Sequence, residues 1–166
     1  MTISFAFTST EPSQQDSQID ESTPFVSSAD GDLLLLQESL QKLNLPPSCQ
    51  DGNGLTPIHS AASYNQIDVL IWLISQEGVD INAKDNDGDT PLHYCDCLDA
   101  AKVLVEEGKA DFKIRNEEGK TALETKQEEL KDTDDEEDSD DEDRISLKAL
   151  VNYLKEVSGI PGDMQQ

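Results

Sequence analysis

The chain has 166 residues, of which 36 are Asp or Glu and 12 are Lys or Arg, so its formal net charge is −24 at pH 7. That charge would repel bare nucleic acid, and no apolar run approaches the ~20 residues of a membrane-spanning helix. We therefore expect one domain that binds neither nucleic acid directly nor a membrane.

The first 21 residues are rich in Ser, Thr and Gln and contain no basic residue. Their composition predicts an unstructured N-terminal arm over residues 1–21. The first basic residue is Lys42, so neither the basic start of a secretory signal nor an Arg-rich presequence is present. We expect a cytoplasmic or nuclear protein. Its three cysteines, an odd number without framework spacing, favour reduced thiols.

A short block of sequence, Gly-x-Thr-Pro followed by Ile or Leu and then His, occurs twice. It begins at Gly54 and again at Gly88, 34 positions later, and a fainter copy begins at Gly119. A period near 33 residues indicates stacked repeats, because each unit is too small to bury its own apolar face. We therefore expect the function to lie in a surface and not in a cleft.

Each block contains a helix start signal. Threonine is a good N-cap, and a proline at the first helical position removes no hydrogen bond, so two helices are predicted to start at equivalent points. The third copy lacks the proline, but Thr121 and Glu124 have the spacing of a capping box. The repeat motif consists of Thr56, Pro57 and His59 in the first copy and of Thr90, Pro91 and His93 in the second.

A second helical run follows each start, over 67–74 in the first copy and 100–105 in the second. Gly78 and Gly108 follow these runs, and we expect each to adopt the left-handed C-cap conformation. The segments 79–88 and 110–119 alternate apolar with polar residues and end in turn-forming residues, as an extended arm leading to a tight turn should.

This pattern resembles the ankyrin-repeat family, with a match that runs from Gly54 to Asp85 in the first copy. The second copy matches through His93 and then departs, because Asp96 replaces an alanine and Asp99 opens the second helix only three residues later. The turn between the helices of that unit is therefore expected to be shortened. The resemblance covers roughly residues 22–158, and two adjoining copies make it specific.

The resemblance implies an all-α solenoid of about four helix-turn-helix units with short β-hairpin-like tips. We place these units at 22–50, 51–84, 85–115 and 116–158, within an ankyrin-repeat domain over 22–158, followed by a tail over 159–166. The first unit would cap the N-terminal end. The last helix would cap the other end through an apolar face formed by Leu147, Leu150, Val151 and Leu154.

An acidic tract interrupts the last unit, with 12 acidic residues between Glu128 and Asp143 and Lys131 as the only basic residue. Such a run predicts a disordered insertion over 128–143, between the two helices of that unit. Ser139 and Thr133 each precede an acidic residue by three positions, which resembles the sites of acidophilic kinases. Phosphorylation there and a tract that is never modified remain open alternatives.

The residues that could carry chemistry all have a structural interpretation. In the family the histidine of the motif braces its repeat by local hydrogen bonds, so we expect structural roles for both histidines. Cys95 replaces a small helix-facing alanine, Cys97 lacks companion ligands, and Trp72 stands at a core position of the second helix. Phosphate-loop, nucleophile-elbow and His-Glu-x-x-His motifs are absent from the sequence. We predict a chain that is not an enzyme and has no cofactor or metal.

In ankyrin repeats, partners usually bind along the concave face made by the hairpin tips and the first helices. We therefore predict a non-enzymatic adaptor or scaffold, monomeric, that binds a protein with a basic surface through this mostly acidic face. The alternative is an acidic chaperone or decoy for basic proteins such as histones or ribosomal proteins, acting through the tract at 128–143. The candidate binding residues are Gly52, Asn53, Leu55, Ser63, Tyr64, Asn86, Asp87, Asp89, Glu117, Glu118 and Lys120.

Overall fold

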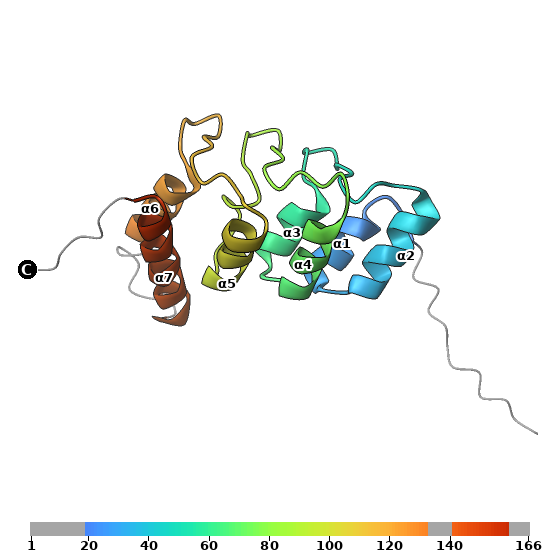
Figure 1. Cartoon of the computed structure of the whole chain (residues 1–166), viewed down its shortest axis with the longest axis horizontal. Coiled ribbons are helices and arrows are strands. Elements are labelled where there is room, and N and C mark those ends of the chain that lie inside the picture. The colour runs from blue at the N-terminus through green and yellow to red at the C-terminus, as the bar shows by residue number, and fades with distance from the viewer. Residues whose placement is uncertain (1–18, 133–140, 160–166) are drawn as a thin grey trace, which may run out of the picture.

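The structure is a computed structural model that describes residues 19–132 and 141–159. Helices stack side by side along the molecule, and three loops rise from the same side of the stack (Figure 1). Within the described ranges there is no strand, only an isolated antiparallel bridge between Arg115 and Thr121. The predicted all-α solenoid is confirmed. The elements are α1 (Thr23–Asp30), α2 (Leu33–Leu43), α3 (Pro57–Ser63), α4 (Ile67–Ser75), α5 (Leu98–Lys102), the π-helix η1 (Val103–Glu107), α6 (Ala122–Asp132) and α7 (Asp141–Val157).

One continuous core runs through the stack. It includes Leu36 in α2, Ile58 in α3, Leu70 in α4 and Leu104 in η1, and it ends at Leu154 in α7, all at most 1% exposed. The terminal helices therefore cover the two ends of the apolar core, which no unit could bury alone. None of the helices in the part of the chain described here is both long and apolar enough to cross a bilayer.

The first complete repeat follows its sequence signals. Thr56 has the extended backbone of an N-cap, with φ −107° and ψ 163°, and Pro57 begins α3. The side chain of Gln66 then reaches back to the preceding pair, where its Nε2 donates a 2.6 Å hydrogen bond to the Ala29 carbonyl. The helix start is thus encoded locally, whereas the contact between pairs joins residues 37 positions apart.

The second repeat differs from the prediction, because the signal at Thr90 produces only a turn over 91–94 and not a helix. Cys97 has an extended backbone, φ −116° and ψ 145°, and α5 follows at once. The shortened connection leaves too few residues to extend the first helix. The amide of Ala100 in α5 instead donates to Asn65 Oδ1 of the preceding repeat, at 3.1 Å.

The two glycines that follow the second helices behave differently. Gly78 is left-handed as predicted, with φ +84°. Gly108 is not, since its φ is −74°, and the left-handed residue is Lys109 with φ +58°. Gly108 is required for another reason: a Cβ there would lie 2.7 Å from the Leu104 carbonyl oxygen and 3.1 Å from a methyl group of Ile81.

The acidic tract is helical at both ends, so the expectation of disorder over all of 128–143 is wrong for those ends. A capping box starts α6: Thr121 N–H donates to Glu124 Oε2 at 2.8 Å, and Glu124 N–H donates to Thr121 Oγ1 at 3.3 Å. Two glutamates of the tract then pair with lysines, Glu128 with Lys120 and Glu129 with Lys126, which favours continuation of α6 to Asp132. Helix α7 begins at Asp141.

Both candidate phosphorylation sites, Thr133 and Ser139, lie outside the described residues, as do residues 1–18 of the predicted arm and 160–166 of the predicted tail.

Candidate functional site

Three tips, tip 1 (51–55), tip 2 (85–89) and tip 3 (116–120), form the loops that rise from the stack in Figure 1. Each is closed by the same backbone hydrogen bond, from the first residue to the carbonyl of the fifth: Asp51 to Leu55 at 2.9 Å, Asp85 to Asp89 at 3.0 Å and Asn116 to Lys120 at 3.0 Å. The side chain of the first residue also accepts from the amide of the fifth in every tip, at 2.9–3.0 Å. The three loops are therefore copies of one turn.

Backbone hydrogen bonds also hold neighbouring tips in register. Asn86 N–H donates to the Asn53 carbonyl at 2.9 Å, and Glu117 N–H donates to the Asp87 carbonyl at 2.9 Å. Gly54 and Gly88 make this approach possible, because a Cβ on either glycine would lie about 3 Å or less from backbone atoms of the next tip. The tips thus form one continuous row.

Each motif histidine ties its own repeat to the next tip. His59 Nδ1 accepts from the Thr56 backbone N–H at 3.1 Å, so this nitrogen carries no proton and Nε2 is the N–H that donates to the Asp89 carbonyl, at 3.2 Å. His93 repeats the arrangement with Thr90 at 3.2 Å and the Lys120 carbonyl at 3.1 Å. Burial lowers the pKa of both rings, which keeps them neutral.

The outer surface of the tip row is mostly acidic. Lys120, the basic residue of tip 3, is neutralised by Glu118 at 2.9 Å and by Glu128 of α6. Tyr64, at the end of α3, is 65% exposed and is the large aromatic of the candidate set. The exposed members of the predicted set are Gly52, Asn53, Tyr64, Asn86, Asp87, Glu117 and Glu118, whereas Leu55, Ser63, Asp89 and Lys120 are partly buried.

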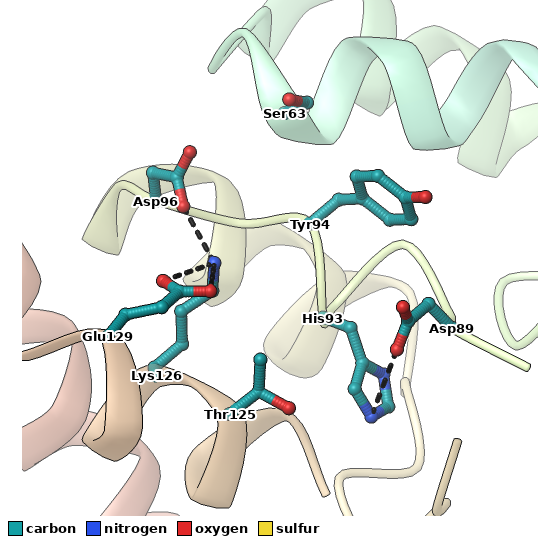
Figure 2. Close-up of a pocket in the computed structure, with 8 residues that line it drawn as sticks. All are labelled: Ser63, Asp89, His93, Tyr94, Asp96, Thr125, Lys126 and Glu129. Atoms are coloured by element: carbon teal, nitrogen blue, oxygen red, sulfur yellow. Dashed lines mark hydrogen bonds and ion pairs between the residues drawn. The ribbon is translucent and has the colours of Figure 1, made fainter. Parts of the chain in front are cut away.

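Below tip 2, a pocket of about 370 Å³ opens between α3, the turn 91–94 and α6. We call it the inner pocket. Figure 2 shows its lining, in which side chains from three successive repeats face one space. The lining residues are Ser63, Asp89, His93, Tyr94, Asp96, Thr125, Lys126 and Glu129.

An ion cluster of one buried lysine and two more exposed carboxylates forms one wall of the inner pocket. The side chain of Lys126 is only 4% exposed, and its Nζ lies 2.7 Å from Asp96 Oδ1 and 2.9 Å from Glu129 Oε2. Burial alone would lower the pKa of Lys126, but the two carboxylates more than offset it, so the pKa lies above its usual value. Lys126 is therefore a charged, fixed part of the wall.

The opposite wall is formed by Asp89, Tyr94 and the groups that hold them. Asp89 Oδ1 accepts from the Asn116 side chain at 2.8 Å, and the Tyr94 hydroxyl donates to Asp85 Oδ2 at 2.6 Å. Burial and this acidic partner raise the pKa of Tyr94 well above its usual range, so the phenol stays protonated. Among the described residues, nothing bonds to the buried Oγ1 of Thr125 on the pocket floor.

Comparison with known proteins identifies the family that has this architecture. The family described as ankyrin repeats in many copies matches residues 40–95, and the single ankyrin repeat matches residues 87–117. The chain is an ankyrin-repeat protein. Ankyrin repeats are generally protein–protein interaction modules and typically have no enzymatic activity.

Several relatives carry similar repeats. An ankyrin repeat-containing protein of Schizosaccharomyces pombe is 37% identical over 95 residues, which is 57% of this chain and 45% of that protein. The SMC5-SMC6 complex localization factor protein 1 of Bos taurus is 58% identical over 54 residues, 32% of this chain and 5% of that protein. A homolog of transient receptor potential cation channel subfamily A member 1 in Caenorhabditis elegans is 42% identical over 67 residues, 40% of this chain and 6% of the channel. The matches thus span less than half the length of each relative.

Within the ankyrin stack, the structure brings only Ser63 and Asp89 of the predicted binding residues into the inner pocket. Sequence reasoning missed Tyr94, Asp96, Lys126 and Glu129. One signal was available, because Lys126 stands five residues after its repeat threonine, where the first complete repeat has the buried Ala61. A lysine at a small, buried position of an ankyrin helix requires a partner charge.

The cysteines and Trp72 lie where the ankyrin pattern places apolar residues. Cys95 is buried in the core, where burial raises the pKa of its thiol, and Trp72 packs against the same core. All three cysteines are free. Over residues 19–132 and 141–159, no group of three or more His, Cys, Asp or Glu side chains is arranged to hold a metal ion.

Proposed function

We propose that this ankyrin-repeat protein is a non-enzymatic adaptor or scaffold that binds a partner protein through the concave face made by its tips and first helices. The observation that carries the proposal is the tip row, which backbone hydrogen bonds between neighbouring tips hold in one register. A rigid row of exposed side chains binds with little loss of conformational entropy, which favours recognition by this surface.

The charge of the row favours a partner with a basic surface. Asp87, Glu117 and Glu118 are exposed on it, and the whole chain carries a net charge of −24. Such a field accelerates association with a basic protein and repels bare nucleic acid. Exposed Tyr64 supplies an apolar anchor of the kind that dominates interface energetics. We further propose that the protein acts as a monomer in the cytoplasm or nucleus.

The use of the histidine rings supports a binding role over an enzymatic one. In both His59 and His93 the two ring nitrogens are engaged with the protein's own backbone. A ring so engaged has no nitrogen left to exchange a proton with a substrate.

A quantitative affinity pull-down tests this proposal. The tip variant combines Asp87→Asn, Glu117→Gln and Glu118→Gln, and we expect it to lose the partners that the unmodified protein retains. The control variant combines Glu77→Gln, Glu107→Gln and Glu156→Gln, which removes the same charge from exposed sites outside the tips. Partners that survive the tip variant as well as they survive the control would contradict the proposal.

The same experiment decides on the alternative, an acidic chaperone acting through the tract. Because α6 ends at Asp132 and α7 begins at Asp141, only residues 133–140 should be replaced, by a Gly/Ser linker of equal length. This removes six acidic residues, together with Thr133 and Ser139, and keeps both helices. Loss of partners in the linker variant alone would support the chaperone over the adaptor.

A further inference from the structure

We propose that the inner pocket is a subsite for a cationic side chain of the bound partner, and that arginine fits it best. The proposal rests on the proposed function, since it assigns one anchoring contact within the same face. It is carried by the pocket's shape, its charge and the hydrogen-bond acceptors left free in its walls.

The pocket is negative as a whole. Its lining holds three carboxylates, Asp89, Asp96 and Glu129, and one ammonium group, that of Lys126. His93 adds no charge, because its Nδ1 accepts a backbone N–H and burial lowers the pKa of its ring. The net charge of the lining is therefore three negative charges less one positive charge, or −2, which favours a cation.

Lys126 belongs to the wall and is not available as a ligand for an anion. Its amine is covered by Asp96 and Glu129, with distances of 2.7 and 2.9 Å. The ion cluster fixes both carboxylates before any partner arrives, so little side-chain entropy is lost on binding. An anionic ligand would have to displace one of them and expose a buried charge.

Free acceptors remain on both sides of the pocket. Asp96 uses Oδ1 for Lys126, and Asp89 uses Oδ1 for Asn116, so the second oxygen of each has no hydrogen bond from the described residues. Figure 2 shows these two carboxylates on opposite sides of the pocket, with Tyr94 on the side of Asp89. Thr125 Oγ1 offers a further acceptor at the floor if the hydroxyl rotates toward a ligand.

Arginine matches this arrangement better than lysine. A guanidinium group presents five donors in a rigid plane and can bond to acceptors on two sides, whereas an ammonium group is a compact and strongly hydrated charge. The half-buried ring of Tyr94 adds a face on which a guanidinium can stack. The volume of about 370 Å³ accommodates one such side chain.

The test is a titration of the full-length, nitrogen-15-labelled protein with three short, capped peptides of Gly and Ser around one central residue. That residue is arginine, lysine or citrulline, the last being the neutral isostere of arginine. We expect the arginine peptide to shift the backbone amide signals of Asp89, Tyr94 and Asp96, the lysine peptide to do so at higher concentration, and the citrulline peptide to leave them in place.

The matched variants are Asp89→Asn and Glu77→Gln. The first retains an oxygen that accepts from Asn116 but removes the charge, and we expect it to weaken binding of the arginine peptide about tenfold. The second removes a charge outside the pocket and should leave binding unchanged. Equal shifts with arginine and citrulline peptides, or unchanged binding in Asp89→Asn, would overturn the subsite. Equal shifts with lysine and arginine would overturn only the preference for arginine.

Failure of the subsite and failure of the proposed function are distinguishable. If the tip variant releases the partners while Asp89→Asn binds the arginine peptide normally, the face is correct and the subsite is wrong. If the arginine peptide binds in the pocket but the partners survive the tip variant, the subsite is correct and the tip row is not the binding surface.

Discussion

Lys126 Nζ lies 2.7 Å from Asp96 Oδ1, and these two residues replace two small residues of the repeat. Counted from the threonine of each block, Lys126 stands where the first complete repeat has Ala61, and Asp96 stands where it has Ala62. The two substitutions lie in successive repeats, so the ion pair ties one unit to the next. The pair is asymmetric, because the lysine side chain is 4% exposed and the aspartate side chain is 61% exposed.

This asymmetry predicts that substituting Asp96 and substituting Lys126 lower the free energy of unfolding by different amounts. Asp96→Ala leaves a buried ammonium with Glu129 as its one remaining partner, and we expect it to lower the free energy of unfolding by about 1–3 kcal/mol. Lys126→Met keeps the apolar stem and leaves only accessible carboxylates, so its cost should stay below about 1 kcal/mol. Urea denaturation at neutral pH measures both. A larger loss for Lys126→Met would contradict the assigned asymmetry.

His59 should be important for stability. His59→Ala removes the acceptor for the buried Thr56 N–H and the donor to the Asp89 carbonyl, and we expect a cooperative loss of about 1–3 kcal/mol. Ser60→Ala is the matched control in the same helix, since the Ser60 hydroxyl makes no hydrogen bond to the described residues. An unchanged urea midpoint for His59→Ala would refute the bracing role.

The two histidines also predict a pH dependence. Burial holds the pKa of His59 and His93 below the ordinary value of about 6.5, so the unfolded chain takes up protons first as the pH falls. The contribution of the two neutral rings to the free energy of unfolding is fully present above about pH 6.5. Below that pH it is lost, by up to about 1.4 kcal/mol per pH unit for each ring.

The measurement is the urea midpoint as a function of pH, for the unmodified chain and for a His59→Gln, His93→Gln variant. Acidification also protonates carboxylates, which changes stability because it relieves repulsion in this acidic chain. The variant keeps the same carboxylates, so the difference between the two proteins isolates the effect of the histidines. We expect the unmodified chain to lose more stability than the variant on acidification. Parallel curves would show that neither ring is held neutral by the fold.

Gly108 provides a test of close packing that is independent of backbone conformation. Its φ of −74° is open to any residue, but an added Cβ would meet the Leu104 carbonyl oxygen at 2.7 Å. We expect Gly108→Ala to destabilise by about 1–3 kcal/mol, as overpacking does. Gly52→Ala, where nothing lies within 4 Å of the added Cβ, should change stability by less than about 0.5 kcal/mol. Thermal unfolding of both variants decides the matter, and equal melting temperatures would exclude the steric role.

Much of the fold could be predicted from local signals. The Thr-Pro start at Thr56, the capping box from Thr121 to Glu124 and the apolar face around Leu150 each depend on residues close in sequence, and each appears as expected. The signal at Thr90 failed for a non-local reason. Too few residues separate Thr90 from the start of α5 at Leu98 for a first helix to form, so the same start residues gave only a turn.

The inner pocket could not be predicted in the same way, because three repeats contribute to it. Asp96 is recognisable in the sequence as a departure from the repeat pattern, but its partner Lys126 lies 30 positions away. Acidic composition also misled the prediction at 128–132, where pairing of Glu128 and Glu129 with lysines favours a helix. Pairing across repeats, unlike a helix start, is visible only once the register of the stack is known.

The central claim is that a protein partner lies along the tips and the inner pocket. Site-specific photo-crosslinking tests it most directly, with a benzophenone amino acid placed in turn at Tyr64, at Asn86, at the outer position Asp68 of α4 and at Thr133 in the acidic tract. We predict crosslinks to one partner from Tyr64 and Asn86, and none from Asp68 or Thr133. Crosslinks from Asp68 or Thr133 without any from Asn86 would contradict it.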